Sequence, residues 1–190
     1  MLVPFTREWT VERERRRRLS TAVSAIRREP DEADVAWLAA VATNGDLDHA
    51  RWELRYARWA LAALSSQRDA LDDRTASQVV GALLRSLRED ERVEPALRAL
   101  AEHQLNDRLS GYREAFQARG GEAGSGERLG RVLLAFASDG ARSAGAPLPR
   151  AMELLSGYLT DANDALRAAY GAVSLPEHLP PSEISGARHE

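Results

Sequence analysis

The stretch from His49 to Leu64, HARWELRYARWALAAL, constrains the fold of this chain more than any other segment. At about 100° per residue, a helix over this stretch places Trp52, Tyr56 and Trp59 in one narrow stripe, bordered on both sides by alanines and leucines. The opposite strip carries Arg51, Arg55 and Arg58, followed by Ser65 just after the segment. An arc that is apolar over more than half of the circumference is typical of the central helix of a bundle.

Glu53 lies near the middle of this apolar arc, where a lone ionised carboxylate costs too much free energy to persist without a partner. On the helix expected at about residues 95–118, Arg108 also falls within the apolar arc, and its guanidinium suits a bidentate pair with a carboxylate. His49, one turn before Glu53, is a second candidate partner. We therefore predict a structural ion pair between Glu53 and Arg108. Two alternatives stay open, in which Glu53 either faces a partner together with the tryptophans or acts as a catalytic carboxylate.

Apolar residues recur with helical spacing through most of the chain, and no segment alternates apolar and polar residues as a strand would. The expected helices cover about residues 7–28, 31–43, 46–71, 73–90, 95–118, 127–138 and 149–170. In the fifth of these, the inward arc includes Leu97 and Leu100. The pattern predicts an all-α, single-domain bundle of six or seven helices with an extended N-terminal arm and an irregular C-terminal tail. The three parts are a basic arm and helix at 1–30, the helical bundle at 31–170, and a proline-containing tail at 171–190.

Charge is distributed unevenly along the chain. Residues 1–28 hold eight arginines and three glutamates, a net charge of +5, whereas the rest holds 18 arginines and 26 acids, a net charge of −8, which together give −3. The basic segment also carries aromatic side chains, and its candidate partner-binding residues are Phe5, Trp9, Arg13, Arg15, Arg16, Arg17 and Arg18. Such a segment suits an acidic protein face or an anionic membrane surface. The plain alternatives are that it folds back on the acidic body or forms a solvated helix.

Several chemistries find no support in the residues. The chain has no cysteine, which removes disulfides, zinc–cysteine sites and thiol catalysis. The pairs His49/Glu53 and His103/Asp107 have helical spacing, but carboxylate-bridged metal bundles use a Glu-x-x-His pair that is absent here. We therefore predict no catalytic, cofactor-binding or metal-binding residues. Nucleic acid is a poor partner, because the body is acidic and no aromatic residue is interleaved with the arginine run.

The location expected from the sequence is the cytoplasm. No run of 18 apolar residues is long enough to span a bilayer, and the first ten residues, MLVPFTREWT, are too polar for a signal peptide. The basic arm adds the option of peripheral attachment at the cytoplasmic face of a membrane. All 26 basic residues are arginines and alanine is abundant, which is typical of codon bias in a GC-rich bacterial genome.

The function expected from these features is that of a non-enzymatic helical subunit or adaptor, a structural protein that docks onto a larger protein complex through its aromatic and arginine-rich arm and its tail. The complex is expected to be membrane-associated in one version of this hypothesis. The first alternative is a helical enzyme, or a protein binding a metal or small molecule, with its site around His49, Glu53 and Tyr56. The second is a regulator that binds nucleic acid through the basic arm.

Overall fold

The computed structural model describes residues 6–68, 72–118, 124–138 and 147–171, and within them it contains seven α-helices, one short 3₁₀ helix and no strand. The elements are α1 (Arg7–Ile26), α2 (Glu32–Val41), α3 (Leu47–Arg68), α4 (Asp73–Arg88), the 3₁₀ helix η1 (Pro95–Leu97), α5 (Arg98–Gln117), α6 (Ser125–Ala137) and α7 (Leu148–Tyr170). The predicted all-α class is confirmed. Phe5 and the expected tail, apart from Gly171, lie outside the described residues.

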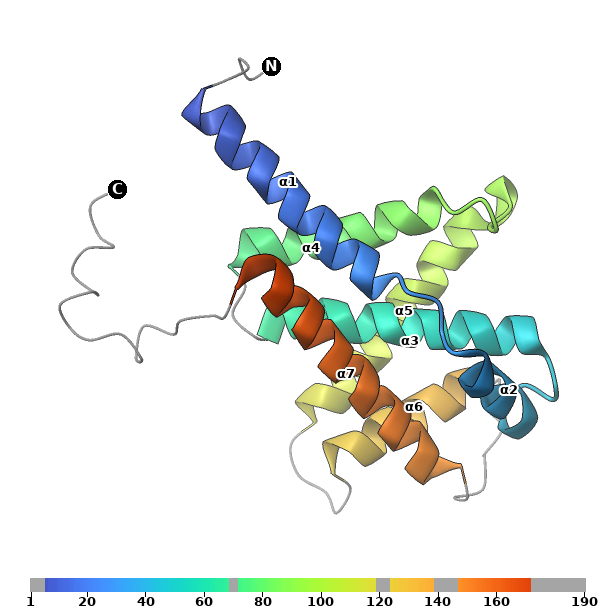
Figure 1. The fold of residues 1–190 in the computed structure, drawn as a ribbon. Coiled ribbons are helices and arrows are strands. Elements are labelled where there is room, and N and C mark those ends of the chain that lie inside the picture. The colour runs from blue at the N-terminus through green and yellow to red at the C-terminus, as the bar shows by residue number, and fades with distance from the viewer. Residues whose placement is uncertain (1–5, 69–71, 119–123, 139–146, 172–190) are drawn as a thin grey trace.

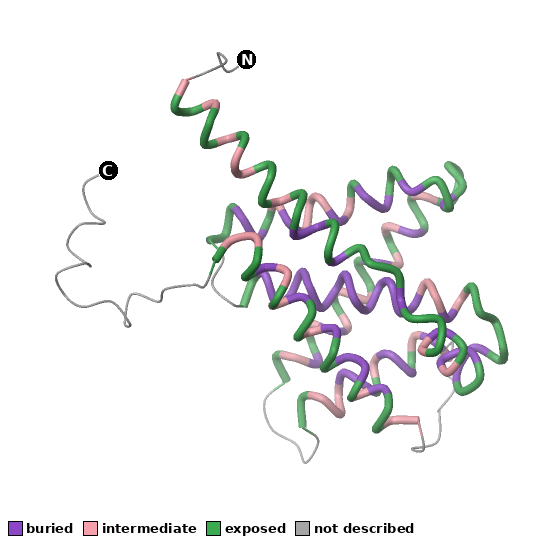
Figure 2. Tube along the Cα trace, viewed as in Figure 1, coloured by how far each residue is buried: buried purple, intermediate pink, exposed green. Residues whose placement is uncertain are grey.

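The central position belongs to α3, as the sequence predicts. This helix contacts each of the other six α-helices, and Figure 1 shows it crossing the middle of the bundle. Its residues are buried almost without interruption from Glu53 to Ser66, which appears as the long purple stretch in Figure 2. Three residues of the polar strip opposite the tryptophan stripe are therefore buried too, namely Arg55, Arg58 and Ser65, whereas Arg51 is partly exposed.

Two apolar clusters meet along α3. The first joins α3 to α2, α5, α6 and α7, with Leu38, Leu54, Leu61, Tyr112, Leu133 and Leu155 among its most buried members. The second joins α3 to α1, α4, α5 and α7, with Ala22, Trp59, Val79, Leu83, Leu87 and Ala162 among its members. Burial of these side chains is the main favourable contribution to folding.

Local sequence signals set several helix boundaries. Asp31 and Asp72 are the N-cap residues of α2 and α4, and each carboxylate accepts a hydrogen bond from a backbone N–H of the first turn. Asn44 and Gly45 have φ angles of 54° and 88° and form the turn before α3. The carboxylate of Asp46 then accepts hydrogen bonds from the backbone N–H groups of residues 48 and 49 at 3.0 and 2.9 Å. Capping of this kind satisfies donors that the helix itself leaves unpaired.

The inward assignment of Leu97 and Leu100 is wrong, because their exposed fractions are 50% and 52%. Pro95–Leu97 forms a separate 3₁₀ turn, so the helical period counted from Pro95 does not continue into α5. Leu100 is also about 140° from the buried Leu105 at 100° per residue, on a different face of α5.

Candidate functional site

The structure brings together the two charged residues that the sequence predicts to pair. Arg108 on α5 donates from Nε to Oε2 of Glu53 at 3.1 Å and from Nη2 to Oε1 at 2.5 Å. The side chain of Glu53 is 3% exposed, and that of Arg108 is 12% exposed. The guanidinium lies 4.5 Å from the centre of the Phe136 ring. His49 Nε2 is 3.5 Å from Glu53 Oε1. Both carboxylate oxygens of Glu53 are thus occupied by protein donors.

Tyr56 completes this group. Its hydroxyl donates to Oε1 of Gln104 at 3.1 Å. Burial raises the pKa of Tyr56 to about 12, and the neighbouring carboxylate of Glu53 adds to the increase. The residues His49, Glu53 and Tyr56 therefore lie together as the enzyme hypothesis requires, but they form a closed set of contacts. Across the described residues, no group of three or more histidine, aspartate or glutamate side chains is placed to hold a metal ion.

An apolar recess lies along the same helix, beside Trp59. It lies between α3, α4 and α5, which contribute three residues each: Trp59, Ala60 and Ala63; Val80, Leu83 and Leu84; and Leu105, Asn106 and Leu109. Trp59 is 2% exposed, and its indole Nε1 has no hydrogen-bond partner among the described residues. Neither Glu53 nor Tyr56 lines the recess, so it is not the polar pocket that the enzyme hypothesis requires.

Two buried arginines on α3 were missed by the sequence analysis. Arg55 is 2% exposed and Arg58 is 8% exposed. Nη2 of Arg55 donates to Oε2 of Glu29 at 2.5 Å, and its guanidinium stacks 4.2 Å from the centre of the Trp52 ring. Nη2 of Arg58 donates to Oδ2 of Asp161 at 3.0 Å, with the Tyr158 ring centre at 4.5 Å.

The arginines are buried because the segment joining α1 to α2 passes over α3. We call this segment, residues 27–31, the strap. Nη1 of Arg58 donates to the backbone carbonyl of Arg28 in the strap at 3.4 Å. The sequence signal that could have indicated the contact between Glu29 and Arg55 is Glu29-Pro30, an acid in the short link between two helices.

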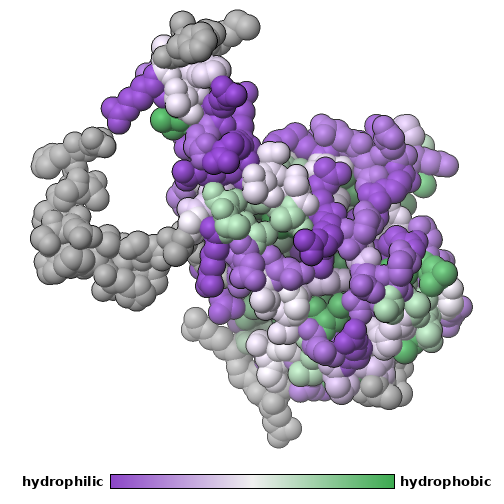
Figure 3. Space-filling model, viewed as in Figure 1, coloured by the Kyte–Doolittle hydropathy of each residue, from purple (hydrophilic) through white to green (hydrophobic). Residues whose placement is uncertain are grey.

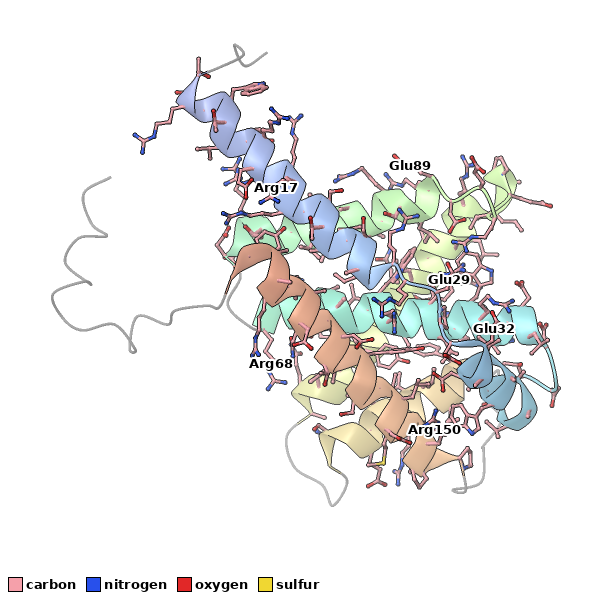
Figure 4. The ribbon with its side chains drawn as sticks, viewed as in Figure 1. Arg17, Glu29, Glu32, Arg68, Glu89 and Arg150 are labelled. Atoms are coloured by element: carbon pink, nitrogen blue, oxygen red, sulfur yellow. The ribbon has the colours of Figure 1, made fainter. Side chains whose placement is uncertain are left out.

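Glu29 carries the strap's second connection. Its Oε1 accepts a hydrogen bond from Nη1 of Arg92 at 2.8 Å, and Arg92 donates in turn to both carboxylate oxygens of Asp90 at 2.8 and 2.7 Å. We call Glu29, Arg55, Asp90 and Arg92 the Glu29 network. Partial burial acts to raise the pKa of Glu29, but hydrogen bonds from Arg92 and Arg55 outweigh it and lower the pKa below its ordinary value. Hydrogen bonds from Arg92 likewise lower the pKa of Asp90. Figure 4 shows Glu29 between the end of α1 and the middle of α3.

The outer part of α1, residues 7–18, projects beyond the bundle (Figure 1). From here on, the name arm is used for these residues alone, within the basic segment at 1–30. None of them is buried, and Val11 is 57% exposed. The arm holds six arginines and three glutamates, a net charge of +3. Figure 3 shows it mostly purple, the colour of hydrophilic residues, with white and green areas between. The candidate residues Trp9, Arg13 and Arg15–Arg18 all lie on the arm, whereas Phe5 lies outside the described residues.

The arginine run is engaged within the helix. Arg16 donates to Glu12 at 3.0 Å, and Arg17 and Arg18 donate to Glu14 at 2.8 and 2.9 Å. Arg15 lies 3.7 Å from Glu12. Arg13 lies 5.3 Å from the centre of the Trp9 ring. These exposed pairs add little to the stability of the helix, and they leave the arm with a surplus of positive charge.

Comparison with protein-family models, with characterised proteins and with solved structures finds no match to this chain. Among the helices of the described residues, none combines the length and the apolar character needed to cross a membrane.

Proposed function

We propose that this chain is a helical subunit or adaptor that docks onto a protein partner through its arm, with the bundle as a rigid body behind it. The observation that carries the proposal is the arm itself, a basic stretch of helix that projects from the bundle and in which no residue is buried. A short helix without tertiary packing is marginal in water. A partner surface would therefore add to the packing of residues 7–18.

The arrangement of side chains on α1 indicates how a partner would bind. The face of α1 that packs on the bundle carries Leu19, Val23 and Ile26, the latter two buried. At 100° per residue, Trp9 and Val11 flank the outward continuation of this same face, about 80° to either side of it. We infer that the partner continues the cradle that α4 and α7 form around the base of α1. The strip between Trp9 and Val11 carries Glu8, Glu12 and Arg15, so the partner would receive a basic helix with one apolar side chain on each side of a charged strip.

The partner's chemistry follows from the arm's charge and side chains. Because the arm has a net charge of +3, we expect acidic residues on the partner's surface. Trp9 and Val11 would contact apolar side chains that lie between those acids. Interface energy concentrates in tryptophan and arginine residues that are fully desolvated on binding. Arginines of the arm pair with Glu12 and Glu14 at exposed positions. On binding they would reorient and exchange these pairs for pairs with the partner's acids.

The test is affinity purification of the full-length tagged chain from its host, with the membrane fraction included. Val11→Asp places a charge on the arm, and Val41→Asp makes the same change at the exposed end of α2, where Val41 is 37% exposed. We expect Val11→Asp, and deletion of residues 1–18, to abolish co-purification of a partner that Val41→Asp retains. Recovery of the same amount of partner with every variant would contradict the proposal. Binding of the arm to anionic vesicles, with no protein recovered, would assign the arm to a membrane surface instead.

A further inference from the structure

We propose that Glu29 is a positioning residue, whose carboxylate locks the strap onto α3 and so fixes the direction in which the arm points. The purpose of fixing the arm's direction rests on the proposed docking function. The contacts that hold the strap on α3 belong to this chain and do not depend on a partner. The residues concerned are the strap and the Glu29 network.

The strap is held at two consecutive residues by arginines that are buried on α3. Arg58 binds the carbonyl of Arg28, and Arg55 binds the carboxylate of Glu29. Arg92, in the link that follows α4, binds the other oxygen of Glu29. The junction of α1 and α2 is thus tied to α3 on one side and to the end of α4 on the other. Pro30, the next residue of the strap, is also buried.

The helix before the strap, α1, makes buried contacts only near its C-terminal end. Its buried residues are Ala22, Val23 and Ile26, all within its last five positions. From Ile26 to Arg7 the helix extends about 28 Å, so a rotation of about 10° at its base would move its tip by about 5 Å. Apolar contacts are not directional and permit small rotations. The hydrogen-bonded pairs of the strap are directional, and together with the packing of α1 on α4 and α7 they favour one orientation.

The composition of the network fits positioning better than stabilisation. Within the Glu29 network, Arg55 Nε is buried without a hydrogen-bond partner among the described residues, while the side chains of Glu29 and Arg92 are 49% and 51% exposed. Ion pairs with half-exposed partners contribute little net stability, because water screens the charges. What such a network does provide is one geometry in which its charges are paired, and here that geometry includes the angle of α1.

The chain lacks cysteine, so cysteines introduced at two sites are the only positions that a thiol-reactive spin label can modify. We use Thr10→Cys on the arm and Ser110→Cys on α5, both at exposed positions, and measure the distance distribution between the labels by pulsed electron paramagnetic resonance. The background chain is expected to give one narrow distribution. Adding Glu29→Gln should at least double its width while far-UV circular dichroism shows the helices retained.

The matched control is Glu32→Gln, three residues further on. Glu32 pairs with Arg51 at 2.9 Å, but its side chain is 78% exposed and it is not part of the Glu29 network. Its removal should leave the distribution unchanged. If Glu29→Gln does not fold, Arg92→Gln replaces it, because Arg92 is half-exposed and its loss leaves the pair between Arg55 and Glu29 in place. A smaller broadening is expected for this variant.

An unchanged width in folded Glu29→Gln, or in Arg92→Gln where that variant is used, overturns the inference, as does equal broadening in Glu32→Gln. No partner is present in this measurement. It therefore tests the strap separately from the affinity purification with Val11→Asp, which tests the docking function.

Discussion

Replacing Glu53 offers a direct measure of how the central ion pair contributes to stability. The Arg108 side chain is 12% exposed and its guanidinium lies near the Phe136 and Tyr56 rings. Glu53→Ala would leave this nearly buried charge without its counter-ion. Removing one partner of a buried pair typically costs about 3–5 kcal/mol. Glu53→Gln keeps the shape and one acceptor oxygen for Arg108, so we expect a smaller loss of about 1.5–3 kcal/mol.

The assay is urea unfolding together with calorimetry. For a chain of this length each kcal/mol corresponds to roughly 2–4 °C in Tm, so Glu53→Ala should lower Tm by roughly 6–20 °C. The double variant Glu53→Leu/Arg108→Leu removes both charges and should recover most of the loss. Glu32→Ala, which breaks the exposed pair with Arg51, should cost less than about 1 kcal/mol. Equal and negligible losses for Glu53→Ala and Glu53→Gln would refute the reasoning that a buried, charged pair holds α3 to α5.

Three further predictions concern other parts of the bundle. The pKa values of Glu29 and Asp90 are lowered in the folded chain. The stability that these two carboxylates contribute is therefore complete above their ordinary pKa values of 4.5 and 3.8, and it is lost as pH falls through the lower pKa values of the folded chain. Glu29→Gln removes the share of Glu29, so the free energy of urea unfolding should depend less steeply on pH below about pH 4.5. Gly130→Ala should give a lower Tm than Gly157→Ala, because its new Cβ would lie 2.9 Å from Leu148 Cδ1, 3.2 Å from Met152 Cγ and 3.4 Å from the backbone nitrogen of Met152. Gly157→Ala meets no atom within 4 Å and should stabilise by about 0.5–1 kcal/mol, and an equal effect of the two on Tm would contradict the packing of α6 on α7. Leu100→Gln should change the free energy of unfolding by less than about 0.5 kcal/mol, and a larger loss would show that the side chain is covered.

Features with a local cause could be predicted from the sequence. Asp31, Asp46 and Asp72 cap helices through contacts two or three residues away, so their role is visible in the chain itself. Glu53 and Arg108 were expected to pair because each is a charge within an otherwise apolar arc, with His49 as a second candidate partner for Glu53. Whether the arm binds a partner stays a prediction.

The contacts of Arg55 and Arg58 could not be predicted in the same way. A helical projection places both on the polar strip of α3 and gives no information on what covers that strip. Arg55 meets a carboxylate 26 residues away, and Arg58 meets one 103 residues away. Their burial depends on the path of the strap and on the packing of α7, which are tertiary features. The same limit applies to the recess beside Trp59, because its walls come from three helices.

The position of α3 between the two apolar clusters has a consequence for cooperativity. Each cluster takes part of its wall from α3, and neither retains a closed core when that helix is removed. The bundle therefore has no plane along which it can divide into two separately stable halves. We therefore expect local opening at the periphery, such as the arm, and we expect the backbone amides in the middle of α3 to exchange with solvent only through unfolding of the whole bundle.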